Sequence, residues 1–174
     1  MITVLADKIA NDLGQSVYQK IIKTGRDIKY FDLENMEVGP CYSCGGCKGK
    51  TYGRCVVRDD ADLILPYVLR SDTIIMFTSI VFGSYSFQAK RALDKLHLIA
   101  RYYYYHDGEL KRGKPSGIKY YVIGIHDGVD MEDIQAFKQL VNENINILSW
   151  SGKAIVMPYD AEDYESLMQE LVEL

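Results

Sequence analysis

Apolar residues along the chain follow two kinds of pattern, one typical of buried strands and one typical of amphipathic helices. Short apolar runs bounded by polar residues predict the strands, and the run at 73–78 is the clearest because it is almost continuously apolar. Such a run is typical of a central parallel strand buried on both faces. The predicted strands are 2–6, 27–31, 73–78, 119–125 and 153–157.

Between these strands, apolar residues recur at helical spacing. Leu13, Val17 and Ile21 form the apolar face of the first helix, which we expect Asn11 or Asp12 to cap. The first helix is expected to end at Gly25, and Asp60 is expected to cap the second. The other helices are expected to span about 86 to beyond 102, 131–146 and about 162–171. The charged, glycine-rich segment 106–117 is predicted to be a surface loop.

Strands that alternate with helices imply a parallel sheet with right-handed crossovers and helices on both faces. The order of elements therefore predicts a single α/β domain over 1–174, a flavodoxin-like three-layer sandwich with a five-stranded parallel sheet in the order 2-1-3-4-5. A cysteine-rich excursion at about 39–58 interrupts the alternation. Ligands of such sheets bind outside the carboxyl ends of the strands, which points to the loops after Ala6, Thr78 and Ile125.

Composition and charge narrow the class of partner. The chain has 174 residues, 48% of them hydrophobic, and a formal net charge of −4, which argues against nucleic acid as the main partner. The longest apolar run, about 73–82, is far shorter than the ~20 residues that span a membrane. The first residues lack the basic start of a secretory signal. We therefore expect a cytoplasmic protein with no membrane or nucleic-acid partner.

Four cysteines, Cys41, Cys44, Cys47 and Cys55, lie within one short stretch. A disulfide framework would spread its cysteines over the fold, whereas these can only link one loop to itself. Three thiols at two-residue intervals, with a fourth further on, suit a [4Fe–4S] cluster, and nearby glycines give the backbone freedom to wrap it. A zinc site, a dithiol–disulfide switch and a loop that binds no metal are the alternatives.

Two motifs resemble a known family. The first is Gly39-Pro40-Cys41-x2-Cys44-x2-Cys47, followed by Gly53-x-Cys55-Val56-Val57-x-Asp59-Asp60. The second runs from Ser71-Asp72 through Thr78-Ser79-Ile80-Val81-Phe82-Gly83-Ser84-Tyr85-Ser86 to Lys90-Arg91-x-Leu93-Asp94-Lys95. Both are similar to motifs of the iron–sulfur flavoproteins, which belong to the NADPH-dependent FMN reductase superfamily.

The resemblance implies an FMN-dependent oxidoreductase or electron-transfer protein. In the family, the loop equivalent to 78–85 packs against the flavin ring, and the loop at 124–128 reaches its pyrimidine edge, where His126 is able to donate a hydrogen bond. The implied cofactor-binding residues are Lys8, Asn11, Thr78, Ser79, Ile80, Val81, Phe82, Gly83, Ser84, Tyr85, Gly124, His126, Asp127 and Gly128. The implied metal ligands are Cys41, Cys44, Cys47 and Cys55. A solvated loop histidine is the alternative interpretation of His126.

The first loop departs from the family. Members of the family begin with a serine-rich phosphate-binding loop, whereas this chain has Asp7 and Asp12 there, and only Lys8 offsets their charge. A carboxylate beside a phosphate costs affinity. The alternatives to a flavoprotein are accordingly a flavodoxin-fold binding or assembly subunit that has lost FMN, and a zinc-stabilised domain.

Partners follow from the same resemblance. NAD(P)H or a redox protein is the expected electron partner. The tyrosine run 102–105 lies on a helix that in the superfamily commonly forms subunit contacts, so we expect a homodimer or homotetramer. His97 is interpreted as a packed or partly exposed helical residue without a catalytic role.

Overall fold

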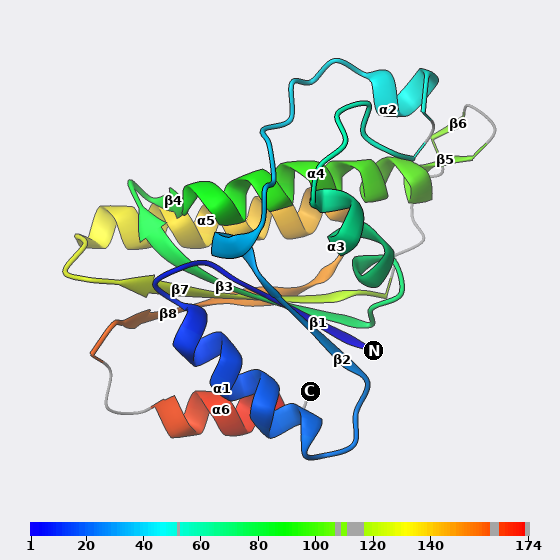
Figure 1. The fold of residues 1–174 in the computed structure, drawn as a ribbon. Helices are drawn as coiled ribbons and strands as arrows, with labels where there is room; N and C mark the ends of the chain where they lie inside the picture. Colours follow the sequence, from blue (N-terminus) through cyan, green and yellow to red (C-terminus); the bar gives the residue numbers. More distant parts are fainter. Residues whose placement is uncertain (52, 107–108, 111–116, 161–163, 173–174) are drawn as a thin grey trace.

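The structure is a computed structural model, and it describes residues 1–51, 53–106, 109–110, 117–160 and 164–172 (Figure 1). Its centre is a parallel sheet in the order β2-β1-β3-β7-β8. Counted among the parallel strands alone, this is the predicted order 2-1-3-4-5. The strands are β1 Ile2–Ala6, β2 Ile28–Asp32, β3 Thr73–Val81, β7 Lys119–His126 and β8 Ser151–Pro158.

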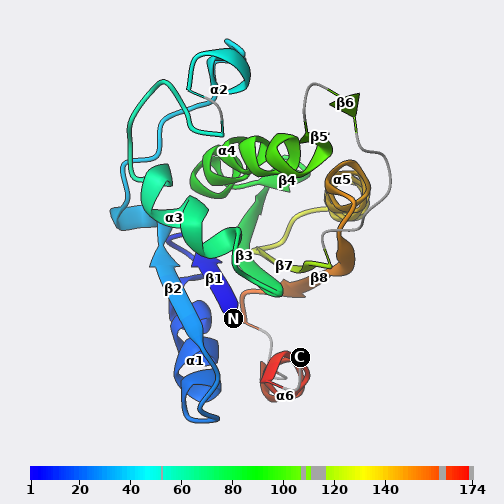
Figure 2. The same cartoon turned by 90° about the vertical axis from the view of Figure 1, so that its right-hand side faces the viewer.

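Helices cover both faces of the sheet, as the alternation of elements predicts. One layer consists of α1 (Asn11–Ile22) and α6 (Tyr164–Val172), and the opposite layer of α3 (Ala61–Val68), α4 (Phe87–Tyr104) and α5 (Met131–Leu148) (Figures 1 and 2). The cysteine excursion carries the one-turn helix α2 (Gly46–Gly49) and lies above α4, away from the sheet.

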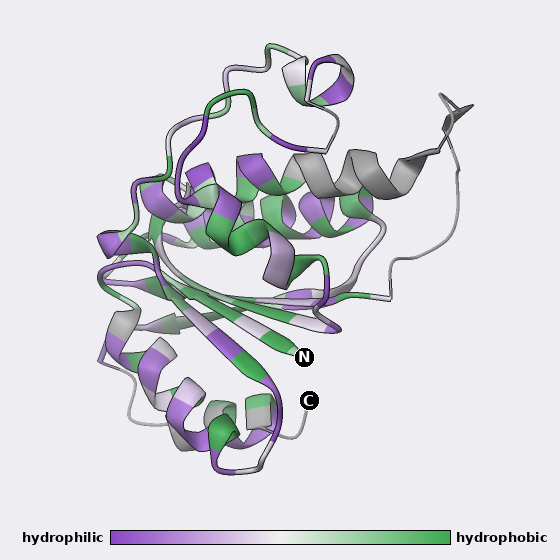
Figure 3. Ribbon diagram, turned by 45° about the vertical axis from the view of Figure 1, so that its right-hand side comes forward, coloured by the Kyte–Doolittle hydropathy of each residue, from purple (hydrophilic) through white to green (hydrophobic). Residues whose placement is uncertain are grey.

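The central strand explains the continuous apolar run. Ile74 and Met76 pack into the core beneath α3, α4 and α5, whereas Ile75 and Phe77 pack into the core beneath α1 and α6. All four side chains are fully buried. Successive residues of a strand point to opposite faces, so a strand covered on both sides has to be apolar at every position. Figure 3 shows hydrophobic segments along the strands of the sheet, between the two layers of helices.

Some local features differ from the sequence-based expectations. Strand β3 continues to Val81, beyond the predicted end, because the short strand β4 (Ser84–Tyr85) folds back and pairs with it. Part of the predicted loop 106–117 forms a small antiparallel ladder between β5 (Tyr105–His106) and β6 (Glu109–Leu110). Residues 107–108 and 111–116 of that loop lie outside the described residues.

The predicted helix caps were wrong in detail. The N-cap position of α1 is Ala10, and no side chain caps it. Asp60 is the N-cap residue of α3, but its carboxylate does not cap that helix. It accepts a hydrogen bond from the Glu37 amide at 2.8 Å, and the neighbouring Asp59 accepts one from the Ala61 amide at 3.1 Å.

Within the described part of the chain, no helix is both long enough and apolar enough to cross a bilayer.

Candidate functional site

The register of the sheet brings three turns to its carboxyl edge. Ala6, the last residue of β1, lies opposite Phe77, and further along β3, Thr78 and Ser79 lie opposite Gly124 and Ile125 of β7. The chain therefore leaves β1, β3 and β7 on the same side of the sheet. This is the edge, next to the point where the strand order reverses, at which doubly wound sheets bind their ligands.

The first turn is held to the second by a buried carboxylate. The side chain of Asp7 is 1% exposed, and its Oδ1 accepts a hydrogen bond from the Ala10 amide at 3.1 Å. Its Oδ2 accepts two more, from the Ser79 amide at 2.7 Å and from the Ser79 hydroxyl at 3.2 Å. The sequence indicated an acidic first loop but did not indicate that its acid is an internal structural element.

The two other first-turn candidates contribute less to this edge. The Lys8 ammonium lies 2.8 Å from a carboxylate oxygen of Glu34, in the short 3₁₀ helix Leu33–Asn35. The hydrogen bond and charge of Glu34 raise the pKa of Lys8. Lys8 is thus engaged in a surface ion pair. The side chain of Asn11 lies outside the described part of the structure.

The second turn is a tight β-hairpin between β3 and β4. Ile80 pairs with Tyr85 and Val81 with Ser84, which leaves Phe82 and Gly83 as a two-residue turn. Both turn residues have positive φ, 49° and 66°, as a type I′ hairpin requires. A positive φ is an unfavourable backbone region for an aromatic residue. Phe82 is nevertheless held there, and the residue is 94% exposed. The hairpin therefore presents an aromatic ring at the carboxyl edge.

Other residues of the predicted flavin loop support the hairpin from within. Thr78 is buried, and its hydroxyl oxygen accepts a hydrogen bond from the Ser86 amide at 3.0 Å. The Tyr85 hydroxyl accepts one from the Asn144 side chain at 3.3 Å. A Cβ on Gly83 would lie 2.9 Å from that of Ala136, so the turn packs closely on α5. Ile80 is buried, whereas Val81 is exposed beside Phe82.

The third turn holds a buried nitrogen that lacks a partner. Among the described residues, Nδ1 of His126 is buried and has no hydrogen-bond partner. Asp127 and Gly128 follow it at the surface, and Gly128 has a φ of 72°. Gly124 precedes it, and a Cβ there would lie 2.5 Å from the ring of Phe137. A buried polar atom without a partner is consistent with a site that takes a ligand group.

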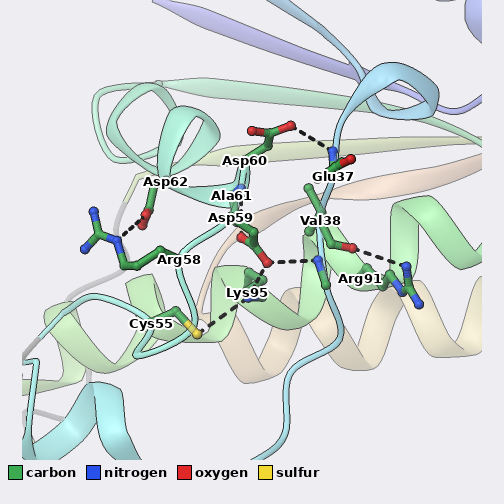
Figure 4. Close-up of polar contacts among 11 residues, drawn as sticks. Glu37, Val38, Cys55, Arg58, Asp59, Asp60, Ala61, Asp62, Arg91 and Lys95 are labelled. Atoms are coloured by element: carbon green, nitrogen blue, oxygen red, sulfur yellow. Dashed lines mark hydrogen bonds and ion pairs between the residues drawn. The ribbon is translucent and has the colours of Figure 1, made fainter.

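The cysteine excursion is fastened where it leaves and rejoins the fold. Oδ2 of Asp59 accepts hydrogen bonds from the Gly39 amide and from the Lys95 ammonium, both at 2.8 Å (Figure 4). The Lys95 ammonium also lies 3.5 Å from the Cys55 thiol. Arg91 donates to the Val38 carbonyl at 3.4 Å. Helix α4 thus holds both ends of the excursion.

Lys95 and Asp59 form a buried ion pair. Their side chains are 1% and 11% exposed. Burial alone would lower the pKa of Lys95, but the hydrogen bond and charge of Asp59 outweigh it and the pKa is raised. Burial would likewise raise the pKa of Asp59, but hydrogen bonds from Lys95, Gly39 and Ala61 hold it below its ordinary value. The sequence showed both residues as parts of motifs but did not show that they pair.

The four cysteines all belong to the described residues, and none of them forms a disulfide. Cys41 and Cys44 are exposed, whereas Cys47 and Cys55 are half-buried against the core. No three cysteine, histidine or acidic side chains of the described residues lie close enough together to hold a metal ion. The donor set, four thiols on one glycine-rich excursion, suits an iron–sulfur cluster chemically, but the thiols are not already gathered around one position.

Comparison with known proteins identifies relatives of this chain. A sequence model of the family described as NADPH-dependent FMN reductase matches residues 4–157. An iron–sulfur flavoprotein of Methanocaldococcus jannaschii is 33% identical over 83 residues, which are 48% of this chain and 42% of that protein. An iron–sulfur flavoprotein of Methanosarcina thermophila is 35% identical over 69 residues, 40% of this chain and 35% of that protein. The matches thus span less than half the length of these relatives.

Solved structures resemble the whole fold. An FMN-dependent NADH-azoreductase from Bacillus anthracis, in complex with FMN, superposes with a TM-score of 0.64 at 12% identity and covers 99% of this chain and 94% of that chain. A flavodoxin-type WrbA-like protein from Agrobacterium tumefaciens superposes with a TM-score of 0.59 at 10% identity, covering 98% and 89%. At these identities the likeness concerns the fold.

Proposed function

The chain belongs to the NADPH-dependent FMN reductase family, and from this premise we propose that it is a flavin-dependent redox protein whose flavin lies at the carboxyl edge. The observation that supports the proposal most is the convergence of the three turns there, with the Asp7–Ser79 contact joining two of them. A bound FMN supplies reversible transfer of a hydride or of single electrons. The chain's own contribution is to position the ring and to control its surroundings.

The exposed and unpartnered groups of this edge are the ones that would hold the ring. The Phe82 ring offers an aromatic face on a backbone fixed by the hairpin. The buried Nδ1 of His126 offers a hydrogen-bonding group to a ring heteroatom. Val81 adds exposed apolar surface next to Phe82, and the exposed Asp127 and Gly128 follow His126 in the third turn. The buried Thr78, Ile80 and Tyr85 act as support for the hairpin.

We further propose that Cys41, Cys44, Cys47 and Cys55 ligate a [4Fe–4S] cluster. A cluster on the excursion supplies one-electron transfer beside the two-electron chemistry of a flavin. Two relatives of the chain are iron–sulfur flavoproteins, which supports this ligand set. Because the thiols are not yet gathered in the described structure, the excursion has to rearrange around the metal while its two ends stay fastened to α4.

The electron partner proposed for the protein is taken from the descriptions of its relatives. We propose NAD(P)H, or a redox protein, as the electron partner, since related proteins are described as NADPH- or NADH-dependent. We also propose a cytoplasmic location and association into a homodimer or homotetramer. The tyrosine run 102–105, on which that association would depend, has side chains outside the described part of the structure.

Anaerobic purification followed by visible spectroscopy and analysis of iron, sulfide and flavin tests the proposal. We expect flavin absorption, restored by added FMN, and iron with sulfide that the Cys44→Ser variant loses while its flavin remains. If added flavin never binds, the redox assignment is wrong. One zinc without iron would instead identify a zinc-stabilised domain.

A second function has one observation in its favour. Asp7 fills the first turn with an internal carboxylate, which suits a flavodoxin-fold binding or assembly subunit that has lost its cofactor. The same FMN titration separates the two, because a subunit of this kind shows no saturable binding.

A further inference from the structure

The turn that follows β1 contains a buried carboxylate, that of Asp7. In doubly wound sheets, the phosphate of a bound nucleotide or flavin sits at the amino end of the helix that follows the first strand, where backbone N–H groups point at it. Here that position leads into α1, and the Asp7 carboxylate accepts hydrogen bonds from the Ala10 amide at 3.1 Å and the Ser79 amide at 2.7 Å. Two backbone donors facing this turn are therefore already engaged by the protein itself.

The carboxylate belongs to the framework of the fold. Asp7 is 1% exposed, it also accepts a hydrogen bond from the Ser79 hydroxyl, and its own amide donates to the Phe77 carbonyl at 3.1 Å. A ligand phosphate could use these donors only by displacing Asp7, which would leave a carboxylate buried without partners. Such a displacement is costly because buried polar groups need hydrogen bonds.

The charges around the turn oppose a second anion as well. Lys8, the basic residue of this turn, has its ammonium 2.8 Å from Glu34. Asp12 lies in the first turn of α1 and adds a further negative charge. Burial is the main reason why the pKa of Tyr30 is raised, and the charges of Asp32, Asp12 and Asp7 raise it further. The carboxylates of Asp7, Asp12 and Asp32 thus place negative charge near Tyr30, in the strand next to β1.

We propose that Asp7 makes this protein indifferent to, or selective against, the 5′-phosphate of a flavin, so that it takes a phosphate-free isoalloxazine at least as tightly as FMN. The inference rests on the proposed function, because it assumes a flavin ring at the carboxyl edge. It assigns a specificity to the site: affinity comes from the ring contacts at Phe82 and His126, and the first turn contributes nothing to phosphate binding.

Parallel titrations of the wild-type protein with riboflavin and with FMN, followed by quenching of flavin fluorescence, test this directly. We expect riboflavin to bind with a dissociation constant equal to or lower than that of FMN. FMN binding about tenfold tighter than riboflavin would overturn the inference and leave the proposed function standing. Absence of saturable binding by either flavin would overturn both.

Variants at position 7 add a second test. Asp7→Ser keeps a hydroxyl that is able to accept from the Ala10 amide but removes the charge, and Asp7→Asn is the isosteric alternative. We expect either variant to tighten FMN relative to riboflavin by about tenfold, because the charge repulsion is relieved. Glu143→Gln, an exposed position on α5, removes the same charge and should leave the ratio unchanged. An unchanged ratio in a folded Asp7 variant, one that still binds riboflavin, would contradict the assignment.

Discussion

Replacing Lys95 by methionine should weaken the attachment of the cysteine excursion to α4. The substitution keeps an unbranched apolar side chain in the buried position and removes the ammonium that lies 2.8 Å from Asp59. Asp59 is then left 11% exposed with two backbone donors, the amides of Gly39 and Ala61, and without a countercharge. The perturbation therefore removes one partner of a buried ion pair.

The magnitude follows from the surroundings of the carboxylate. Removing one partner of a buried ion pair costs about 3–5 kcal/mol. Because two amides still donate to Asp59, we expect the lower end, about 3 kcal/mol of unfolding free energy. For a chain of this size, that corresponds to a fall in Tm of roughly 6–12 °C. Lys90→Met on the same helix is the matched control. Its i,i+4 partner is Asp94, and the two side chains are 43% and 29% exposed, so it should cost less than about 0.5 kcal/mol.

Urea unfolding with linear extrapolation measures the difference. A double-mutant cycle with Asp59→Asn isolates the pair, and we expect a coupling energy of about 2 kcal/mol, within the range for residues in contact. Hydrogen exchange of the Gly39 amide should accelerate in Lys95→Met, because the acceptor of that amide loses its ion-pair partner. If Lys95→Met and Lys90→Met unfold within about 1 kcal/mol of each other, the reasoning from burial is wrong.

Three further predictions concern other features. The pKa of Asp59 is lowered in the folded state, so the stability that its ionised form contributes is present above about pH 4 and is lost as the pH falls through the folded pKa. The difference in unfolding free energy between wild type and Lys95→Met, measured by urea unfolding, should therefore narrow below about pH 4. A constant difference would contradict this. Gly124→Ala should cost about 1–3 kcal/mol in the same assay, because its Cβ would lie 2.5 Å from the Phe137 ring, and a neutral effect would show that the ring is free to move. Phe82→Asn should raise the thermal midpoint by a few degrees, since it relieves about 1 kcal/mol of strain at a positive φ, and a lower midpoint would show that Phe82 stabilises the turn.

Periodicity was enough to predict the layers of the fold. The fully apolar β3 and the helical spacing around it indicate a covered parallel sheet, and the observed strand order agrees. The hairpin was missed because Phe82-Gly83 lacks the asparagine or aspartate that usually marks a type I′ turn. Its second strand has only two residues, Ser84–Tyr85, which is too short to show a pattern.

The contacts that define the candidate site could not be predicted, because they join residues far apart in the sequence. Asp7 and Ser79 are 72 positions apart, and Asp59 and Lys95 are 36 apart. From the sequence alone, Asp7 indicates only that the first loop is negatively charged. The Asp59-Asp60 pair indicates only the resemblance to a family motif. Their roles depend on which donors the tertiary fold brings to each carboxylate.

Helix α4 connects the two candidate redox sites and fixes the distance between them. It begins at the hairpin, where the Ser86 amide donates to Thr78, and it reaches the excursion at Lys95, beside Cys55. At about 1.5 Å per residue, the step from Ser86 to Lys95 spans roughly 14 Å. A single helix therefore joins the hairpin proposed to bind the flavin ring to the point where the thiol-bearing excursion is fastened at Lys95. If this is its role, Lys95→Met should disturb metal loading at the excursion and leave the flavin dissociation constant unchanged, whereas parallel losses in both would show that the two sites form one unit.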